Sequence, residues 1–132
     1  PPIIIIEMGT ATTMSVIDKN SRYIGGAILP GLRVSLDSMS SNTAQLPRIS
    51  LDTPKKVIGK NTVDCMRSGV IFGNAAMIDG MLSRIEEELG GPATVIATGG
   101  IAKAVLPLCS HNIIYDGALL LKGLLALYEK NK

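Results

Sequence analysis

The chain has 132 residues, of which 46% are hydrophobic and 18% charged, and its formal net charge is +2 at pH 7. This length fits one domain with a sizeable core, and the composition is typical of a compact folded protein. The basic residues form no stripe, and the chain contains three Tyr, one Phe and no Trp. It therefore lacks the stacking and phosphate-tracking surface of a nucleic-acid-binding protein, and we expect no nucleic-acid partner.

Membrane segments, metal motifs and paired cysteines are also missing from the sequence. No apolar run is long enough to span a membrane, and Ile3–Ile6 is too short for a signal peptide. We therefore expect no membrane partner. Cys65 and Cys109 lie in apolar contexts, which predicts buried reduced thiols, and the lone His111 completes no metal-ligand spacing. Because the chain begins with Pro1 rather than Met, we expect it to be part of a longer protein.

The first predicted strand leads into a cluster of polar residues. Residues Ile3–Thr13 read IIIIEMGTATT, and the four β-branched apolar residues predict a buried strand. The glycine that follows permits positive φ and lets a backbone approach a ligand, and N–H groups and hydroxyls in such a turn can bind phosphate oxygens. The pattern indicates a nucleotide-phosphate or cation site here; an ordinary turn is the alternative.

Two more strands and a helix are predicted next. Thr12–Ile17 and Arg22–Leu29 complete an antiparallel meander, and Gly25-Gly26 in the latter suggests a bulge or the close approach of another backbone. A helix from Leu32 to about Thr43 follows. The basic loop 47–60 reads as a solvated surface.

One long helix dominates the middle of the chain. Asn61 is a good N-cap, the pattern continues to Leu89, and Gly90 ends it. Gly69 and Gly73 share one face and suggest close contact between helices or, alternatively, a kink. The apolar positions on which the helix prediction depends are Val63, Met66, Val70, Phe72, Ala76, Met81, Ile85 and Leu89.

The last third of the chain alternates between strands and helices. The predicted elements are a strand at Ala93–Ala97, a turn at Thr98-Gly99-Gly100, a helix at Ile101–Leu108, a strand at Asn112–Tyr115 and a helix from Ala118 to about Glu129, capped by Asp116. An antiparallel meander followed by alternating helices and strands predicts a mixed α/β sheet with helices on both sides.

This order of elements resembles the half-domain of the ribonuclease-H-like, or actin-like ATPase, superfold. Within that superfold the chain looks like the C-terminal half of a type III pantothenate kinase. The motifs that carry the resemblance, in order, are EMGTATT (Glu7–Thr13), YIGGAILPG (Tyr23–Gly31), NTAQLP (Asn42–Pro47), IGKNT (Ile58–Thr62), SGVIFG (Ser68–Gly73), ATGG (Ala97–Gly100) and the terminal ALLLKGLLALYEKN.

The resemblance implies a function for the complete protein. Residues 1–132 would form the C-terminal domain of a kinase that transfers the γ-phosphate of ATP to pantothenate, the first committed step toward coenzyme A. Such kinases are cytoplasmic homodimers that use Mg²⁺ with ATP and require a monovalent cation, K⁺ or NH₄⁺. Phosphoryl transfer of this kind depends on positioning and charge stabilisation.

The resemblance also assigns roles to residues of the first turn. Glu7 matches the monovalent-cation ligand, where the family usually has the shorter Asp, so the cation could sit differently. Thr10 matches an ATP-contacting threonine, and Gly9 lets the backbone approach the ligand. The alternatives are a Glu7 carboxylate that accepts backbone N–H bonds within the turn and a Thr10 that only caps it.

Three further residues match binding positions of the family. Thr62 matches a pantothenate contact that reaches the substrate pocket of the partner subunit; alternatively it only begins a helix. Helix N-termini favour anions, and pantothenate carries a carboxylate, so the two readings are compatible. Gly99 and Gly100 match the place where related folds hold adenosine against the start of a helix.

Two family segments do not occur in this chain. These are the first phosphate loop, Asp-x-Gly-Asn, and the Gly-x-Asp-Arg segment, whose Asp is the general base. We therefore expect no catalytic residue in this chain, a missing N-terminal half that supplies the base, and no activity of the fragment alone. Gly117 replaces a proline often found after the Asp of the last motif, a change expected to affect only helix initiation.

Three readings of the whole chain remain open. It is half of a pantothenate kinase, or a non-catalytic dimerisation or binding module of the same fold, or part of another kinase of the superfold that acts on a sugar or carboxylate. The GTATT and IGKNT segments favour the first reading, because a pure dimerisation module would not need them.

Overall fold

A computed structural model describes residues 1–41, 53–119, 122 and 126. All five predicted strands are present within two residues of their expected bounds. NTAQLP and most of the predicted final helix lie outside the described residues. The elements are β1 (Ile3–Met8), β2 (Ala11–Ile17), β3 (Tyr23–Pro30), α1 (Leu32–Ser41), α2 (Thr62–Leu89), β4 (Thr94–Thr98), α3 (Ala102–Val105), the 3₁₀ turn η1 (Leu106–Leu108) and β5 (Ile113–Tyr115).

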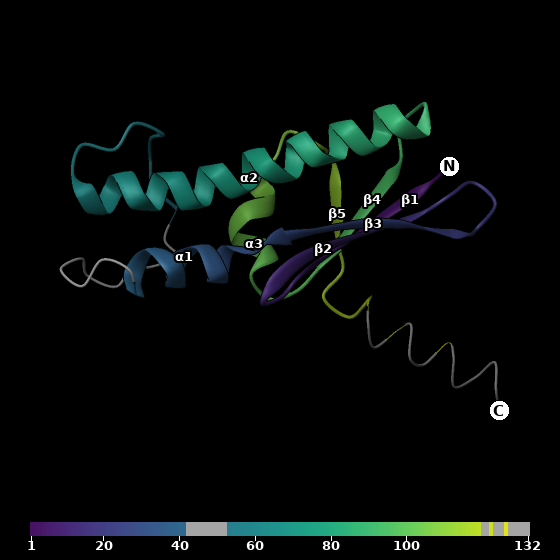
Figure 1. Cartoon of the computed structure of the whole chain (residues 1–132), viewed down its shortest axis with the longest axis horizontal. Helices are drawn as coiled ribbons and strands as arrows, with labels where there is room; N and C mark the ends of the chain where they lie inside the picture. The colour runs from purple at the N-terminus through teal and green to yellow at the C-terminus, as the bar shows by residue number, and fades with distance from the viewer. Residues whose placement is uncertain (42–52, 120–121, 123–125, 127–132) are drawn as a thin grey trace.

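The strands form one mixed sheet in the order β3-β2-β1-β4-β5. β1, β2 and β3 are an antiparallel meander, and β4 and β5 run parallel to β1. This is the arrangement expected of a ribonuclease-H-like half-domain, so the predicted fold class is confirmed. Because β1 and β4 are parallel neighbours, their carboxyl ends lie at the same edge of the sheet (Figure 1).

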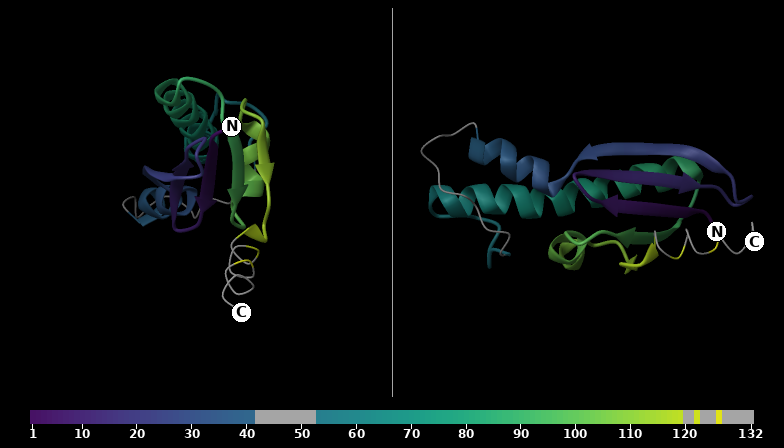
Figure 2. Two further views of the ribbon diagram at one scale, coloured as in Figure 1. Left: turned by 90° about the vertical axis from the view of Figure 1, so that its right-hand side faces the viewer. Right: turned by 90° about the horizontal axis from the view of Figure 1, so that it is seen from below.

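One face of the sheet packs against the described helices. Alternate side chains of β1, namely Ile4, Ile6 and Met8, are buried on this face. α2 runs along the sheet and projects past the ends of its strands (Figures 1 and 2). Helices on both sides of the sheet were predicted, but α1, α2 and α3 all pack on this one face. The opposite face is more open: Ile28 is 79% exposed and Ile114 is 53% exposed.

The ends of α2 are those that the sequence predicts. The Asn61 side chain accepts a 2.9 Å hydrogen bond from the Asp64 N–H, and Gly90 ends the helix in the left-handed conformation at φ 84°. The buried face differs from the predicted set, since Phe72 is only half-buried and Ala76 is exposed. The residues buried on α2 are Ser68, Val70, Ile71, Asn74, Ala75, Ile78 and Leu82.

The glycine pair in β3 has the predicted role. The pairing of β2 with β3 shifts register between Val16 and Ile17, opposite the glycines. A Cβ on Gly26 would lie 1.8 Å from the Met14 carbonyl oxygen, and Gly25 has φ 121°. Gly26 must be glycine because no larger residue could pass the neighbouring backbone so closely, and Gly25 favours glycine because its positive φ strains any residue with a side chain.

The cysteines are free, but one expectation about them is wrong. Cys65 is exposed on α2, because its apolar sequence neighbours turn to a different side of the helix. Cys109 is half-buried, and burial, together with the nearby charge of Asp79, raises the pKa of its thiol to about 11. These surroundings do not favour a reactive thiolate at Cys109. Within the described part of the chain, no helix is both long enough and apolar enough to cross a membrane.

Candidate nucleotide and cation site

The turns that carry the predicted ATP-binding residues lie side by side. Glu7 of β1 pairs with Thr98 of β4, which brings the ends of the two strands together. Directly after Thr98, Gly99 adopts φ 112°, and a Cβ there would lie 2.4 Å from the Met8 carbonyl oxygen. The Gly99 turn therefore packs directly against the end of β1, immediately before Gly9.

The β1–β2 turn is tight and exposed. The Gly9 N–H donates a 3.1 Å hydrogen bond to the Ala11 carbonyl, and both Gly9 and Thr10 are exposed. The positive φ considered for Gly9 is not found, and a Cβ there would be no closer than 3.9 Å to Ala11. Gly9 thus leaves the backbone open to a ligand, but the fold itself does not require a glycine at this position.

A second glycine, to which the sequence assigned no role in the site, packs against the backbone of this turn. Gly31 is buried just after β3, and a Cβ on it would lie 2.8 Å from the Thr10 carbonyl oxygen. The close approach fixes the backbone of Thr10 while its side chain remains exposed. The last glycine of the YIGGAILPG motif, Gly31, could have suggested a close backbone contact. The sequence does not show that Thr10 is the residue it contacts.

Glu7 lies between two threonines on the open face of the sheet. Its register partners are Thr13 on β2 and Thr98 on β4, so the three side chains share one face. In the antiparallel pair, the Cβ atoms of directly opposed residues such as Glu7 and Thr13 lie roughly 5 Å apart. Glu7 is exposed, and in the described part of the chain no N–H of the turn donates to its carboxylate. The observed contacts therefore do not support a purely turn-stabilising role.

The donor chemistry of this group suits a hard cation. A carboxylate and hydroxyl groups are oxygen donors, which K⁺ and Mg²⁺ prefer to nitrogen or sulfur. A cluster of three or more His, Cys, Asp or Glu side chains that could hold a metal ion does not occur among residues 1–41 and 53–119. The oxygen donors that are present fit a hard cation such as K⁺.

The turn after β4 leads into a short helix. The Ala102 N–H donates to the Gly99 carbonyl, and Gly100 is exposed with no atom within 4 Å of a built Cβ. The Asp116 N–H donates to Ala97, which holds the end of β5 beside the end of β4.

A Cβ at Gly117 would lie 2.9 Å from the Tyr115 hydroxyl. Because this atom is the far end of an exposed side chain, Tyr115 could move aside, and the contact does not by itself require glycine.

Thr62 stands apart from both turns. It is exposed at the start of α2, the end that projects past the sheet (Figure 1). The loop before it folds tightly onto the helix, because a Cβ on Gly59 would lie 2.5 Å from the Cys65 nitrogen and the Ser68 hydroxyl donates to the Val57 carbonyl. The IGKNT motif is therefore a fixed structure that presents Ile58 and Thr62 to the outside.

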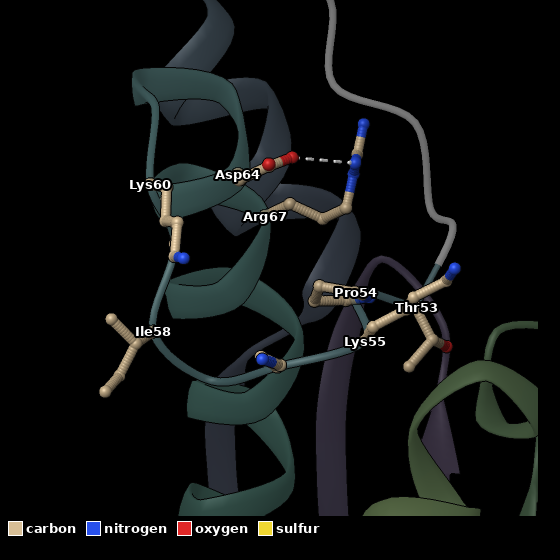
Figure 3. A pocket seen from close by; sticks show the side chains of 9 residues that line it. Thr53, Pro54, Lys55, Ile58, Lys60, Asp64 and Arg67 are labelled. Atoms are coloured by element: carbon tan, nitrogen blue, oxygen red, sulfur yellow. Dashed lines mark hydrogen bonds and ion pairs between the residues drawn. The ribbon is translucent and has the colours of Figure 1, made fainter.

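This loop also forms a basic cavity that the sequence did not reveal. Its volume is about 470 Å³. Figure 3 shows Arg67 paired with Asp64, with Lys55 and Lys60 extending from the loop on either side of the first turns of α2. The lining residues are Thr53, Pro54, Lys55, Lys56, Ile58, Gly59, Lys60, Asp64 and Arg67.

The His111 ring lies between two carboxylates of α2, and its role is structural. Its Nδ1 lies 2.9 Å from Asp79 and its Nε2 lies 3.0 Å from Glu86. Burial alone would raise the pKa of Asp79, but hydrogen bonds from the Ser110 and His111 N–H groups and from the His111 side chain together lower it. This network fixes α2 to the segment before β5, and its long sequence separations explain why the sequence did not predict it.

Comparison with known proteins identifies the family. Residues 1–84 match the family model of type III pantothenate kinase. Curated type III pantothenate kinases from Rhodospirillum rubrum and Exiguobacterium sibiricum are 43% and 47% identical to the chain over 131 residues. That alignment covers 99% of this chain and 51% of each relative, so the chain spans about half the length of the curated relatives it matches.

A solved structure shares the fold. The crystal structure of a Baf family protein from Campylobacter jejuni superposes with a TM-score of 0.68 at 25% sequence identity, over 97% of this chain and 57% of that protein. The order of motifs, the strand topology and the family model agree over most of the described residues. The chain belongs to the type III pantothenate kinase family.

Proposed function

We propose that this chain is the C-terminal half of an enzyme that phosphorylates pantothenate with ATP in coenzyme A biosynthesis. The observation that carries the proposal is the contact of Gly99 with Met8, which joins the two glycine turns at the carboxyl ends of β1 and β4. Ligands of open α/β sheets bind outside the carboxyl ends of the strands. Family membership supplies the substrates, ATP and pantothenate.

In this proposal the two turns hold the nucleotide. The exposed backbone of Gly9 and the hydroxyl of Thr10 face the phosphates, where N–H and O–H donors can bind their oxygens. Gly100 leaves open space beside the start of α3 for adenosine. These groups contribute by positioning, which accounts for much of the catalysis in phosphoryl transfer.

Glu7 is the proposed ligand of the monovalent cation, K⁺ or NH₄⁺, together with nearby hydroxyls of Thr13 and Thr98. The cation, and the Mg²⁺ that accompanies ATP, would offset phosphate charge when bound. Glu7 itself holds the negative charge at the end of β1, directly before the turn that carries Thr10.

Thr62 is the proposed pantothenate contact, and it acts on the site of a second copy. Its exposed position at the projecting end of α2, away from the chain's own glycine turns, agrees with a role across a dimer interface. The exposed face of α2 carries small residues, and a Cβ on Gly69 or Gly73 would meet no described atom within 4 Å beyond the neighbouring backbone of α2 itself. A homodimer packed along this face would bring Thr62 to its partner.

The general base belongs to the N-terminal half in this proposal, so the chain alone should be inactive. The test is an assay of pantothenate-dependent ADP release, on this chain alone and on the full-length protein. We expect turnover only by the full-length protein, because a general base contributes about 10²- to 10⁴-fold and the first phosphate loop is missing as well. Turnover by the chain alone would contradict the assignment of the base to the N-terminal half.

A non-catalytic dimerisation module is the alternative, but the small-residue face of α2 fits a dimeric kinase equally well and does not favour the module. The same assay separates the two readings. A full-length protein that dimerises but releases no ADP with pantothenate would support the module and contradict the kinase.

A further inference from the structure

We propose that the basic cavity at the start of α2 is a second anion site, which binds an oligophosphate chain independently of the nucleotide turns. None of the residues that line the cavity belongs to the Gly9–Thr10 or Gly99–Gly100 turns, and Thr62 itself is not among them, although Ile58, Gly59 and Lys60 belong to the same IGKNT motif. The proposal therefore adds an anion site to those of the proposed kinase function. The cavity measures about 470 Å³, within the range of small-molecule sites.

The charge of the cavity is the first argument. Lys55, Lys56, Lys60 and Arg67 line it, with Asp64 as the lone carboxylate among its lining residues. The excess of cations at this one place is greater than the net charge of +2 on the whole chain. Positive charge is therefore concentrated here rather than spread over the surface.

The lone carboxylate is already engaged. The Asp64 carboxylate accepts a 2.9 Å hydrogen bond from the Asn61 side chain and pairs at 3.3 Å with Arg67. The three lysines form no ion pair with any residue that the structure describes. Their ammonium groups, unlike Arg67, are thus available to an external anion.

The loop that carries the lysines is held in place before any ligand arrives. Gly59 packs against the backbone of Asp64 and Cys65, and the Ser68 hydroxyl bonds to Val57. Such preorganisation reduces the cost of ordering on binding. It distinguishes these lysines from solvated ones on a free loop.

The chemistry selects an oligophosphate. Lysine ammonium groups bind phosphate as point charges with several donors, and lysines spread around one cavity match several linked phosphates better than a single one. Ile58, which is 81% exposed, and Pro54 give the rim an apolar side that could accept a nucleoside. A nucleotide and an inorganic chain are therefore the two sources to compare.

The experiment is a titration of the isotope-labelled 132-residue chain at low ionic strength, followed by amide NMR shifts and calorimetry. The probes are tripolyphosphate, ATP and, as a carboxylate control, citrate. We expect tripolyphosphate to shift amides of residues 53–67, and to bind more tightly than citrate. Tighter binding of ATP with larger shifts at Ile58 would assign the site to nucleotides; equal binding would assign it to the phosphate chain alone.

The variants make the test decisive. Lys55→Gln/Lys56→Gln/Lys60→Gln should weaken tripolyphosphate binding about tenfold, since three weak charge interactions are lost. A matched control replaces as many exposed cations elsewhere, Lys19→Gln/Arg22→Gln/Arg84→Gln, and should change the affinity by less than about twofold.

The proposal would be overturned if both triple variants lost the same affinity for tripolyphosphate, or if the lysine variant lost none. It would also be overturned if citrate bound as tightly as tripolyphosphate, or if the amide shifts were confined to Gly9, Thr10, Gly99 and Gly100. Thermal unfolding of each variant confirms that it is folded. Because no step uses kinase activity, this test is independent of the proposed function.

Discussion

The imidazole Nδ1 of His111 lies 2.9 Å from the Asp79 carboxylate, and the His111 N–H also donates to that carboxylate at 3.1 Å. With the 2.8 Å bond from the Ser110 N–H, these contacts attach the chain before β5 to the middle of α2. Asp79 therefore accepts hydrogen bonds from Ser110 and His111, which are 31 and 32 residues further along the chain.

Replacing Asp79 should destabilise the fold. Asp79→Ala leaves the N–H groups of Ser110 and His111 without their acceptor, and hydrogen bonds to a charged group are worth about 1.5–3 kcal/mol. We expect a lower free energy of unfolding by roughly that amount, measured by urea denaturation at neutral pH. Glu87→Ala, an exposed change on the same helix, should have little effect. Similar losses in both variants would contradict a specific role of Asp79.

The same junction should depend on pH. The native pKa of Asp79 lies below its ordinary value, so the carboxylate stabilises the native state fully above the unfolded pKa near 4 and loses this contribution as pH falls through the lowered native value. The wild type should therefore lose more stability than Asp79→Ala between about pH 5 and pH 2. Parallel stability curves for the two proteins would contradict the prediction.

Glu7→Gln in the full-length protein should weaken activation by K⁺. The amide keeps the size of the side chain but removes the charge that attracts the cation, whereas Thr13 and Thr98 remain. The measurement is the K⁺ concentration that gives half-maximal ADP release. Glu88→Gln, an exposed charge at the far end of α2, serves as the control. Unchanged activation in Glu7→Gln would remove Glu7 from the cation site.

Thr62→Ala in the full-length protein should raise the KM for pantothenate about two- to tenfold, the loss expected for one hydrogen bond of 0.5–1.5 kcal/mol. The helix cap should survive, because Asn61 and not Thr62 provides it. Asn61→Ala, by contrast, should cost about 1 kcal/mol of stability. A change in the KM for ATP without one for pantothenate would count against the proposed contact.

Two substitutions of one glycine test the α2 interface. Apart from the backbone of α2 itself, no described atom lies within 4 Å of a Cβ built on Gly73, so neither variant should disturb the single chain. Gly73→Ala should stabilise it by about 0.5–1 kcal/mol through helix propensity. Gly73→Leu should shift the protein toward monomer in sedimentation if copies pack along this face. A dimer that tolerates leucine would place the interface elsewhere.

Gly99→Ala tests the contact between the two turns. The new methyl group would lie 2.4 Å from the Met8 carbonyl oxygen and would require an unfavourable φ of 112°, so we expect a loss of about 1–3 kcal/mol in stability and a higher KM for ATP. Gly100→Ala, where no atom is within 4 Å, is the matched control. Equal behaviour of the two variants would contradict the role of the Gly99 turn.

The sequence alone determined the elements with strong local signals. Asn61 and Gly90 set the ends of α2 because a cap and a left-handed glycine act within one turn of the helix. The apolar run at Ile3–Ile6 likewise predicted β1, and the ordered motifs indicated the family that the comparison then showed.

The tertiary structure decided which surfaces meet. Apolar residues occur on several sides of α2, so the sequence alone does not show which side is buried. Packing against the sheet buries Ile71, Ala75, Ile78 and Leu82 and leaves Ala76 exposed. The contact of Gly99 with Met8 joins segments about ninety residues apart, because β1 and β4 pair in parallel. Such contacts depend on the register of distant strands, which no local pattern in the sequence encodes.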